Sequence, residues 1–210
     1  MTSVDNRLQQ AWQAQSLLLG YPDDLAGRLD LLTTVASTLD DRVGAPLLRF
    51  LDHVEQTAPH VLAEEYVATF DHRRRCCLFL TYYAHGDTRN RGVALLRLKQ
   101  TYAAAGQHLV DDELPDHLAV MLEFAASGDP QLGAGLLEEH RAGLELLRLA
   151  LHDQHSPWAD VLDSVSATLA PLRGDQRQAV ARLAAAGPPA EQVGLAPFAP
   201  PEYMPQGDRS

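Results

Sequence analysis

The sequence predicts an all-α protein, a single helical bundle of about eight to ten helices. Hydrophobic residues make up 46% of the chain and aromatic residues only 6%. The apolar residues are mostly leucine and alanine, which favour helix over strand, and they recur with helical spacing. At 210 residues the chain can build one sizeable core. We expect one helical domain over residues 1–186 and a flexible tail over residues 187–210, which holds six of the 13 prolines.

Four short helices are predicted before residue 71. Asp5 can cap the first, and the Gly-Tyr-Pro sequence at residues 20–22 ends it. Leucine and alanine repeat at helical spacing over residues 25–39, which predicts the second helix. Pro46 and Pro59 each suit the first turn of a helix, so we expect the third and fourth helices to open there.

The middle of the chain predicts a buried segment followed by two helices. Residues 76–83 are apolar all round, so a helix here would be central and buried. The turn over residues 86–92 interrupts the pattern. A helix over residues 93–102 then stops near Gly106, and Pro115 opens the next one.

Three further helices are predicted towards the C-terminus. An Asp-Pro pair at residues 129–130 is a cap followed by a first-turn proline, and the apolar pattern then continues to Leu151. This predicts the longest helix of the chain. A Ser-Pro pair at residues 156–157 repeats the start signal, and Asp175 can cap a last helix that runs through Leu183.

Charge and cysteine content exclude several classes of protein. The formal net charge of −11 disfavours binding to nucleic acid, which needs a basic face, and also disfavours a helical transcription regulator. No apolar run approaches the ~20 residues that span a bilayer, and residues 1–19 lack the unbroken apolar stretch of a signal peptide. Cys76 and Cys77 are adjacent, and we interpret them as small apolar residues in a reducing compartment. We expect a cytoplasmic protein with no membrane insertion.

The patterns typical of enzymes and metal sites do not occur in the sequence. There is no GxxxxGK[ST] loop, and no histidine has a glutamate three residues before it, as a di-metal helical bundle typically requires. His152 and His155 could share one side of a helix, yet their place before a Ser-Pro pair favours solvated side chains. We expect no catalysis, no metal and no tightly bound cofactor, with a helical-bundle metal-binding enzyme as the alternative.

The segment "EEYVATFDHRRR" (residues 64–75) places two aromatic residues one helical turn apart, followed by charge. Tyr66 and Phe70 form either a buried aromatic stripe or the floor of a peptide groove, and Asp71 and Arg75 belong to the charged turn beside it. Both interpretations stay open.

The turn "HGDTRNRG" (residues 85–92) places positive charge where a helix disfavours it. Gly86 and Gly92 permit tight backbone geometry, and Asp87 or Thr88 can cap the following helix. Arg89 and Arg91 lie near the helix N-terminus, whose dipole is also positive. They are satisfied either by ion pairs within the chain or by contacts to a partner.

The segment "ELPDHL" (residues 113–118) forms, with residues 111–112, the most acidic patch of the chain. Pro115 occupies a first helical turn, and Glu113, Asp116 and His117 cluster at the expected exposed helix end. The carboxylates complement the helix dipole and could also steer a basic peptide. His117 sits among acids that would favour its charged form, so it could sense pH.

Taken together, three stretches resemble a known family. "YVATFDHRRRCCLFLTYYAHGDTRNRGVALLRLKQTY" followed by "ELPDHLAVMLEF", with "LLLGYPDD" near the N-terminus, is similar to the NarJ-type nitrate reductase assembly chaperones, relatives of the TorD and DmsD redox-enzyme chaperones. The strong similarity covers about residues 60–126. The motif positions carried over as peptide-binding residues are Tyr66, Phe70, Asp71, Arg75, Asp87, Arg89, Arg91, Glu113, Pro115, Asp116 and His117.

The resemblance implies a TorD-like all-α fold and a non-catalytic role in the cytoplasm. Such a chaperone binds the N-terminal peptide of the apo nitrate reductase alpha subunit. It holds that subunit for insertion of bis-molybdopterin guanine dinucleotide before membrane docking, and is absent from the final enzyme. Molybdenum cofactor biosynthesis proteins are further expected partners. On this basis Glu113 and Asp116 are expected to meet positive groups of the peptide, and Tyr66 and Phe70 to form the apolar floor.

Overall fold

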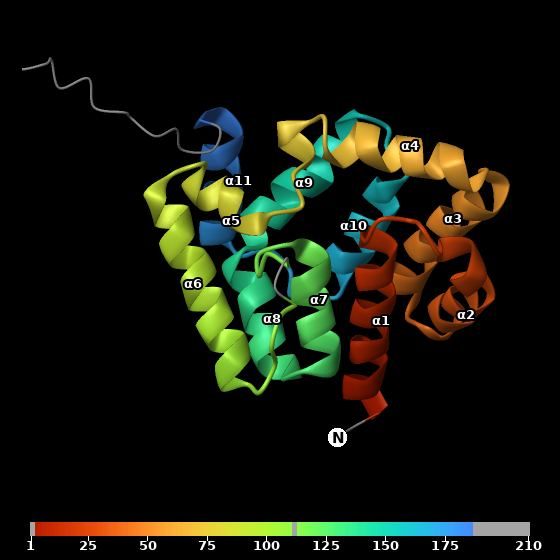
Figure 1. Ribbon diagram of the computed structural model, residues 1–210, viewed down its shortest axis with the longest axis horizontal. Coiled ribbons are helices and arrows are strands. Elements are labelled where there is room, and N and C mark those ends of the chain that lie inside the picture. The colour runs from red at the N-terminus through yellow and green to blue at the C-terminus, as the bar shows by residue number, and fades with distance from the viewer. Residues whose placement is uncertain (1–2, 111–112, 187–210) are drawn as a thin grey trace, which may run out of the picture.

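The computed structural model describes residues 3–110 and 113–186 (Figure 1). Over these residues it contains eleven α-helices, one 3₁₀ turn and no strand, which confirms the all-α prediction with slightly more helices than expected. The predicted tail, residues 187–210, lies outside the described residues, as do Asp111 and Asp112. The elements are α1 (Ser3–Leu19), α2 (Leu25–Thr38), α3 (Asp41–Gln56), α4 (Pro59–Phe70), η1 (Arg74–Cys76), α5 (Leu80–His85), α6 (Arg89–Ala104), α7 (Leu118–Ser127), α8 (Pro130–Glu139), α9 (Arg141–Asp153), α10 (Trp158–Ala167) and α11 (Gly174–Ala186).

Helix α1 crosses the middle of the molecule, with α7 on one side and α2 and α3 on the other (Figure 1). Its Trp12 is buried and donates a hydrogen bond from Nε1 to Oγ1 of Thr168, at 3.1 Å. Trp158 of α10 is fully buried and donates in the same way to the carbonyl of Leu18, at 3.1 Å. Both indole N–H groups are therefore satisfied inside the core, as buried tryptophans require.

The four N-terminal helices were predicted correctly, although two of their starts differ. Helix α1 already begins at Ser3, so Asp5 lies inside it. Helix α3 begins at Asp41, because the side chain of Asp40 caps it by accepting a hydrogen bond from the N–H of Arg42 at 3.0 Å. Pro46 therefore lies within α3, and the prediction that it opens the helix was wrong. Pro59 does open α4.

Residues 76–83 are mostly buried, as predicted, but do not form one helix. The chain makes a 3₁₀ turn at η1, continues in extended backbone, and becomes helical again at Leu80. Phe79 pairs with His117 as an isolated antiparallel bridge. The N–H of Leu80 bonds the carbonyl of Asp116 at 2.9 Å, and the N–H of Leu118 bonds the carbonyl of Leu78 at 2.9 Å. The extended backbone is stable here because a second segment satisfies its polar groups.

The helix predicted from residue 129 to Leu151 is divided in two. Asp129 caps α8 as predicted, accepting hydrogen bonds from the N–H groups of residues 131 and 132. His140 then breaks the helix, and α9 starts after it. A Cβ at Gly133 would lie 2.4 Å from Ala125 of α7, and one at Gly143 would lie 3.0 Å from Tyr83 of α5. The two halves each approach a different neighbour closely, which one straight helix would not achieve.

The remaining predicted boundaries are close to the observed ones. Gly106 follows the end of α6 with a φ of 79°, a backbone conformation that glycine adopts readily. Gly92, by contrast, lies inside α6 rather than in the turn before it. Helix α10 starts directly after the Ser-Pro pair, and α11 starts at Gly174, next to the predicted cap Asp175. None of the described helices is long and apolar enough to cross a membrane.

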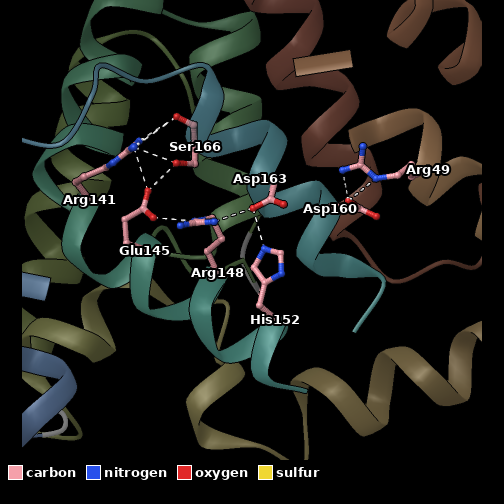
Figure 2. Close-up of polar contacts among 8 residues, drawn as sticks. All are labelled: Arg49, Arg141, Glu145, Arg148, His152, Asp160, Asp163 and Ser166. Atoms are coloured by element: carbon pink, nitrogen blue, oxygen red, sulfur yellow. Dashed lines mark hydrogen bonds and ion pairs between the residues drawn. The ribbon is translucent and has the colours of Figure 1, made fainter. Parts of the chain in front are cut away.

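A polar cluster joins α9 to α10, and we call it the α9–α10 cluster (Figure 2). Glu145 is buried, and its Oε1 forms an ion pair with Arg141 at 3.0 Å and accepts a hydrogen bond from the hydroxyl of Ser166 at 2.7 Å. Its Oε2 accepts from Nε of Arg148 at 2.8 Å, and Arg148 also pairs with Asp163 at 2.8 Å. Both carboxylate oxygens of Glu145 are thus occupied. The residues of the cluster are Arg141, Glu145, Arg148, His152, Asp163 and Ser166.

Candidate functional site

Two clefts open beside the bridge between Phe79 and His117. The first, which we call the α1–α7 cleft, has a volume of about 490 Å³, within the range of ligand pockets. It lies between the C-terminal end of α1, the start of α2, and the chain from Glu113 into α7. Its walls are largely apolar, with one arginine and two glutamates. The lining residues are Ser16, Leu17, Gly20, Tyr21, Arg28, Phe79, Glu113, Leu114, His117, Ala119, Val120 and Glu123.

The second cleft, which we call the α4–α6 cleft, has a volume of about 350 Å³. It lies between the end of α4, the chain through η1 and α5, and the start of α6. It carries charges of both signs beside aromatic rings. The lining residues are Phe70, Asp71, Arg74, Cys77, Phe79, Tyr82, Asp87 and Arg91.

Asp116 is buried, which corrects the expectation that it lies at an exposed helix end. Its side chain has no exposed surface, and helix α7 begins only at Leu118. Oδ2 of Asp116 accepts from the hydroxyl of Thr81 and from Arg91, at 3.4 Å in the second case. Its Oδ1 has no hydrogen-bond partner. Asp116 therefore faces the interior and cannot meet a ligand directly.

The arginines of the turn differ in their environment. Arg91 pairs with Asp116 and, at 3.6 Å, with Asp87, and its guanidinium lies 5.6 Å from the centre of the Phe79 ring. For Arg91 the internal ion pairs are thus confirmed. Arg89 is exposed, and among the described residues no carboxylate forms an ion pair with it.

His117 is less basic than expected. Burial lowers its pKa below the ordinary value of 6.5, and the carboxylates of Asp116 and Glu113 only partly oppose this. The acids do favour the charged form of His117, as expected, but desolvation outweighs them and the net shift of the pKa is downward. Its ring packs edge-on against Phe79, with ring centres 5.2 Å apart.

Tyr66 and Phe70 form a buried stripe, the first of the two interpretations. Both are less than 10% exposed, and their ring centres lie 4.8 Å apart. The hydroxyl of Tyr66 donates to the carbonyl of Leu19 at 3.0 Å, and burial raises its pKa to about 12. Tyr66 lines neither cleft, whereas Phe70 also lines the α4–α6 cleft.

The other positions taken from the resemblance fall into three groups. Glu113 is exposed and lines the α1–α7 cleft, and Asp71 is exposed and lines the α4–α6 cleft. Pro115 is buried, and its carbonyl accepts from the hydroxyl of Tyr102 at 2.8 Å. Arg75 is exposed and lines neither cleft, while its carbonyl accepts from the hydroxyl of Tyr83 at 3.0 Å.

Most of the residues that line the α1–α7 cleft were not predicted as site residues, and five of them bear on the proposed function. Tyr21 lay in a stretch that carried the weaker resemblance, but it was interpreted only as part of a helix end. The others lie at positions where an isolated sequence gives no signal for exposure in a cleft. These residues are Tyr21, Arg28, Phe79, Leu114 and Glu123.

One of the two paired histidine candidates, His152, has a structural partner. His152 lies 2.9 Å from Asp163 and belongs to the α9–α10 cluster (Figure 2). No group of three or more His, Cys, Asp or Glu side chains in the described part of the chain is placed to hold a metal ion. Burial raises the pKa values of Cys76 and Cys77, which keeps both as neutral thiols.

The fold and the two clefts define a helical-bundle protein with concave surfaces on both sides of Phe79. The profile of the nitrate reductase delta subunit family matches residues 36–163. The chain belongs to this family.

Individual relatives agree with that assignment. The probable nitrate reductase molybdenum cofactor assembly chaperone NarJ of Bacillus subtilis is 32% identical over 171 residues, 80% of this chain and 92% of the relative. NarJ of Escherichia coli K12 is 32% identical over 152 residues, 70% of this chain and 64% of the relative. The nitrate reductase-like protein NarX of Mycobacterium tuberculosis is 38% identical over 159 residues, 75% of this chain, which spans only 24% of NarX.

The fold is also found among solved structures. A redox enzyme maturation protein from Archaeoglobus fulgidus superposes with a TM-score of 0.54 at 20% sequence identity, and the match covers 84% of this chain and 93% of that one. The TorD-like fold and the resemblance to NarJ chaperones are thus confirmed. The names of the NarJ relatives agree with the expected non-catalytic role.

Proposed function

We propose that this protein is an assembly chaperone that binds the N-terminal peptide of an apo nitrate reductase alpha subunit. The α1–α7 cleft carries this proposal. It lies beside the Glu-Leu-Pro-Asp-His-Leu segment, within a family whose relatives include molybdenum cofactor assembly chaperones. Such a cleft suits the apolar face of a peptide, because helical peptides bind by placing apolar side chains in a groove.

The charges at the cleft favour a peptide with a basic end. Glu113 and Glu123 are exposed in the lining, and Arg28 is the one arginine there, on a chain whose net charge is −11. Opposite charge accelerates association and makes it sensitive to salt, whereas the apolar contacts of Tyr21 and Leu114 determine how long the complex lasts. Glu113 remains a proposed contact of the peptide's positive groups, and Glu123 replaces the buried Asp116 in that role.

The proposed consequence of binding is that the alpha subunit, the client of the chaperone, stays in its apo form until its cofactor is inserted. The chaperone would hold the apo-subunit in the cytoplasm until bis-molybdopterin guanine dinucleotide has been inserted, and so prevent early docking on the membrane subunit. Molybdenum cofactor biosynthesis proteins are proposed further partners. The cofactor is the client's, so the chaperone needs no catalytic residues of its own.

Isothermal titration calorimetry with the alpha-subunit N-terminal peptide tests the proposal. We expect Glu113→Gln and Glu123→Gln each to weaken binding about threefold, since exposed charge pairs contribute up to about 1 kcal/mol. Glu64→Gln is the matched control, because Glu64 is an exposed glutamate on α4 that lines neither cleft. No binding by the wild-type protein, or equal binding by the double variant, would refute the proposed peptide site.

The cellular role needs a separate test. A strain that lacks this protein should accumulate nitrate reductase without its molybdenum cofactor, measured as metal content and activity of the purified enzyme. Full metal content and full activity in that strain would show that the protein is not the required chaperone, whatever its affinity for the peptide.

A further inference from the structure

Phe79 is shared by the two clefts. It lines the α1–α7 cleft together with His117 and Leu114, and the α4–α6 cleft together with Arg91 and Tyr82. Its side chain is partly exposed. Its backbone is paired with His117, so the position of the ring relative to both clefts is determined by main-chain hydrogen bonds.

A row of aromatic rings connects the clefts on a second side. Tyr21 lines the α1–α7 cleft and Phe70 lines the α4–α6 cleft. Tyr66 lies between them, with its ring centre 5.5 Å from that of Tyr21 and 4.8 Å from that of Phe70. These separations are typical of packed aromatic pairs. The walls of the two clefts are therefore joined both through Phe79 and through this row.

The orientation of the Phe79 ring is held from both faces of the bridge. The guanidinium of Arg91 lies over the ring at 5.6 Å, within the range of a cation–π contact, and His117 packs edge-on at 5.2 Å. Arg91 is in turn held by Asp116, which is fully buried and also accepts from Thr81. Asp116 thus acts on the clefts through Arg91, as a positioning residue.

We infer that the two clefts form one groove for a single peptide, and that Phe79 determines the register in which the peptide lies. This inference rests on the proposed function, since it concerns the same ligand. The peptide it fits has a basic end at Glu113 and Glu123, apolar side chains on either side of Phe79, and polar residues beyond it. There the α4–α6 cleft presents the exposed side chains of Asp71 and Arg74.

Cys77 offers a direct readout of register, because it lines only the α4–α6 cleft and is partly exposed. Alpha-subunit N-terminal peptides that carry a chloroacetamide at successive positions are incubated with the full-length protein at mildly alkaline pH, and alkylation is followed by mass spectrometry. Cys76, which is 1% exposed, and the variant Cys77→Ser serve as controls. In wild-type protein we expect one position, towards the end of the peptide remote from its basic residues, to react about tenfold faster than its neighbours.

Two substitutions of Phe79 complete the test. Phe79→Ala should weaken peptide binding about tenfold, a loss typical of truncating an aromatic anchor, and should spread the alkylation over several peptide positions. Phe79→Leu keeps the apolar bulk, so it should retain most of the peptide affinity. It should still spread the alkylation of Cys77 over several peptide positions. Leu149→Ala is the control, because Leu149 is 44% exposed on α9 and lines neither cleft.

The outcomes separate the inference from the function on which it rests. If wild-type protein does not bind the peptide, the proposed function fails. Free chloroacetamide first establishes that Cys77 can be alkylated under these conditions. If the protein binds the peptide but no peptide position alkylates Cys77, or if the reactive position in both folded Phe79 variants is the same as in the wild type, the single groove is wrong while the peptide site stands. A Phe79→Ala variant that does not fold leaves Phe79→Leu to decide.

Discussion

Two buried carboxylates, Glu145 and Asp116, are each paired with arginine, but their surroundings differ. Glu145 is 2% exposed, both of its oxygens accept a hydrogen bond, at 2.7 and 2.8 Å, and it forms an ion pair with Arg141 at 3.0 Å (Figure 2). Asp116 is 0% exposed, its pairing with Arg91 is longer at 3.4 Å, and its Oδ1 has no partner. Both oxygens of Glu145 therefore have hydrogen-bond partners, whereas one oxygen of Asp116 has none.

The difference indicates what each group does. The α9–α10 cluster connects two helices of the interior and lines neither cleft, so the pairing of both Glu145 oxygens is explained by stability alone. Asp116 lies behind Phe79, where the two clefts meet, and its incomplete pairing is a local departure from the rule that buried polar atoms are satisfied. Buried atoms of Gln15, Arg141 and Ser156 also lack a partner, so the positioning role of Asp116 rests on its ion pair with Arg91, whose guanidinium lies over Phe79.

The largest effect is expected from Glu145→Gln. Both oxygens of Glu145 accept hydrogen bonds, so a glutamine must point its NH₂ group at a donor, and two buried arginine contacts also lose their counter-charge. We expect a loss of about 3 kcal/mol in the free energy of unfolding, the usual size when a buried ion pair is broken. Urea unfolding followed by circular dichroism measures it.

Peptide affinity is the control for that variant. At temperatures where Glu145→Gln is folded, its affinity for the alpha-subunit peptide should equal that of the wild-type protein, since the α9–α10 cluster touches neither cleft. If Glu145→Gln were as stable as the wild-type protein, the α9–α10 cluster would not contribute to the stability of the fold.

Asp116→Asn makes the matched change at the other carboxylate. The asparagine can turn its NH₂ group towards the unpartnered Oδ1 position and keep an oxygen for Thr81 and Arg91. The stability loss should therefore be smaller, about 1–2 kcal/mol for weakened charge-assisted hydrogen bonds. Peptide affinity should fall severalfold, because Arg91 loses the charge that holds it over Phe79. The opposite result, a large stability loss with unchanged affinity, would remove the distinction between the two carboxylates.

The helices were predictable where the signal is local. Asp129 caps α8 and Pro59 opens α4 because a cap and a first-turn proline act through their own backbone neighbours. The break at His140 depends instead on what each half packs against, namely α7 at Gly133 and α5 at Gly143. No pattern within residues 130–151 contains that information.

The site was predictable only in part, for a related reason. The resemblance identified both segments that meet at the bridge, yet periodicity could not distinguish extended from helical backbone in the apolar run at residues 76–83. Acidic neighbours made Asp116 seem exposed, whereas its partners Thr81 and Arg91 lie 35 and 25 residues away in the sequence. Phe79 became a candidate only once both clefts were known to share it.

A smaller effect is expected from pH, through two histidines on the Asp116 side of the molecule. Burial lowers the pKa values of His117 and His140 below 6.5, with Asp116 opposing the shift in both. The unfolded chain therefore binds protons more readily, so stability is complete above about pH 6.5 and is lost progressively as pH falls below it. Urea unfolding at a series of pH values should show this decline, and His117→Asn with His140→Asn should flatten it. An unchanged decline in the double variant would assign it to other groups.

The smallest effect is expected at a third ion pair, which is exposed and therefore tests whether burial is what makes the other two pairs important for stability. Arg49 of α3 pairs with Asp160 of α10, with a distance of 3.0 Å from Nε to Oδ1 (Figure 2). Their side chains are 57% and 27% exposed, so water screens the attraction and can solvate either partner alone. Asp160→Asn should change the free energy of unfolding by no more than about 0.5 kcal/mol, and high salt should abolish the difference. A loss as large as that of Glu145→Gln would show that the α3–α10 contact, rather than desolvation of Glu145, governs the stability of this half of the bundle.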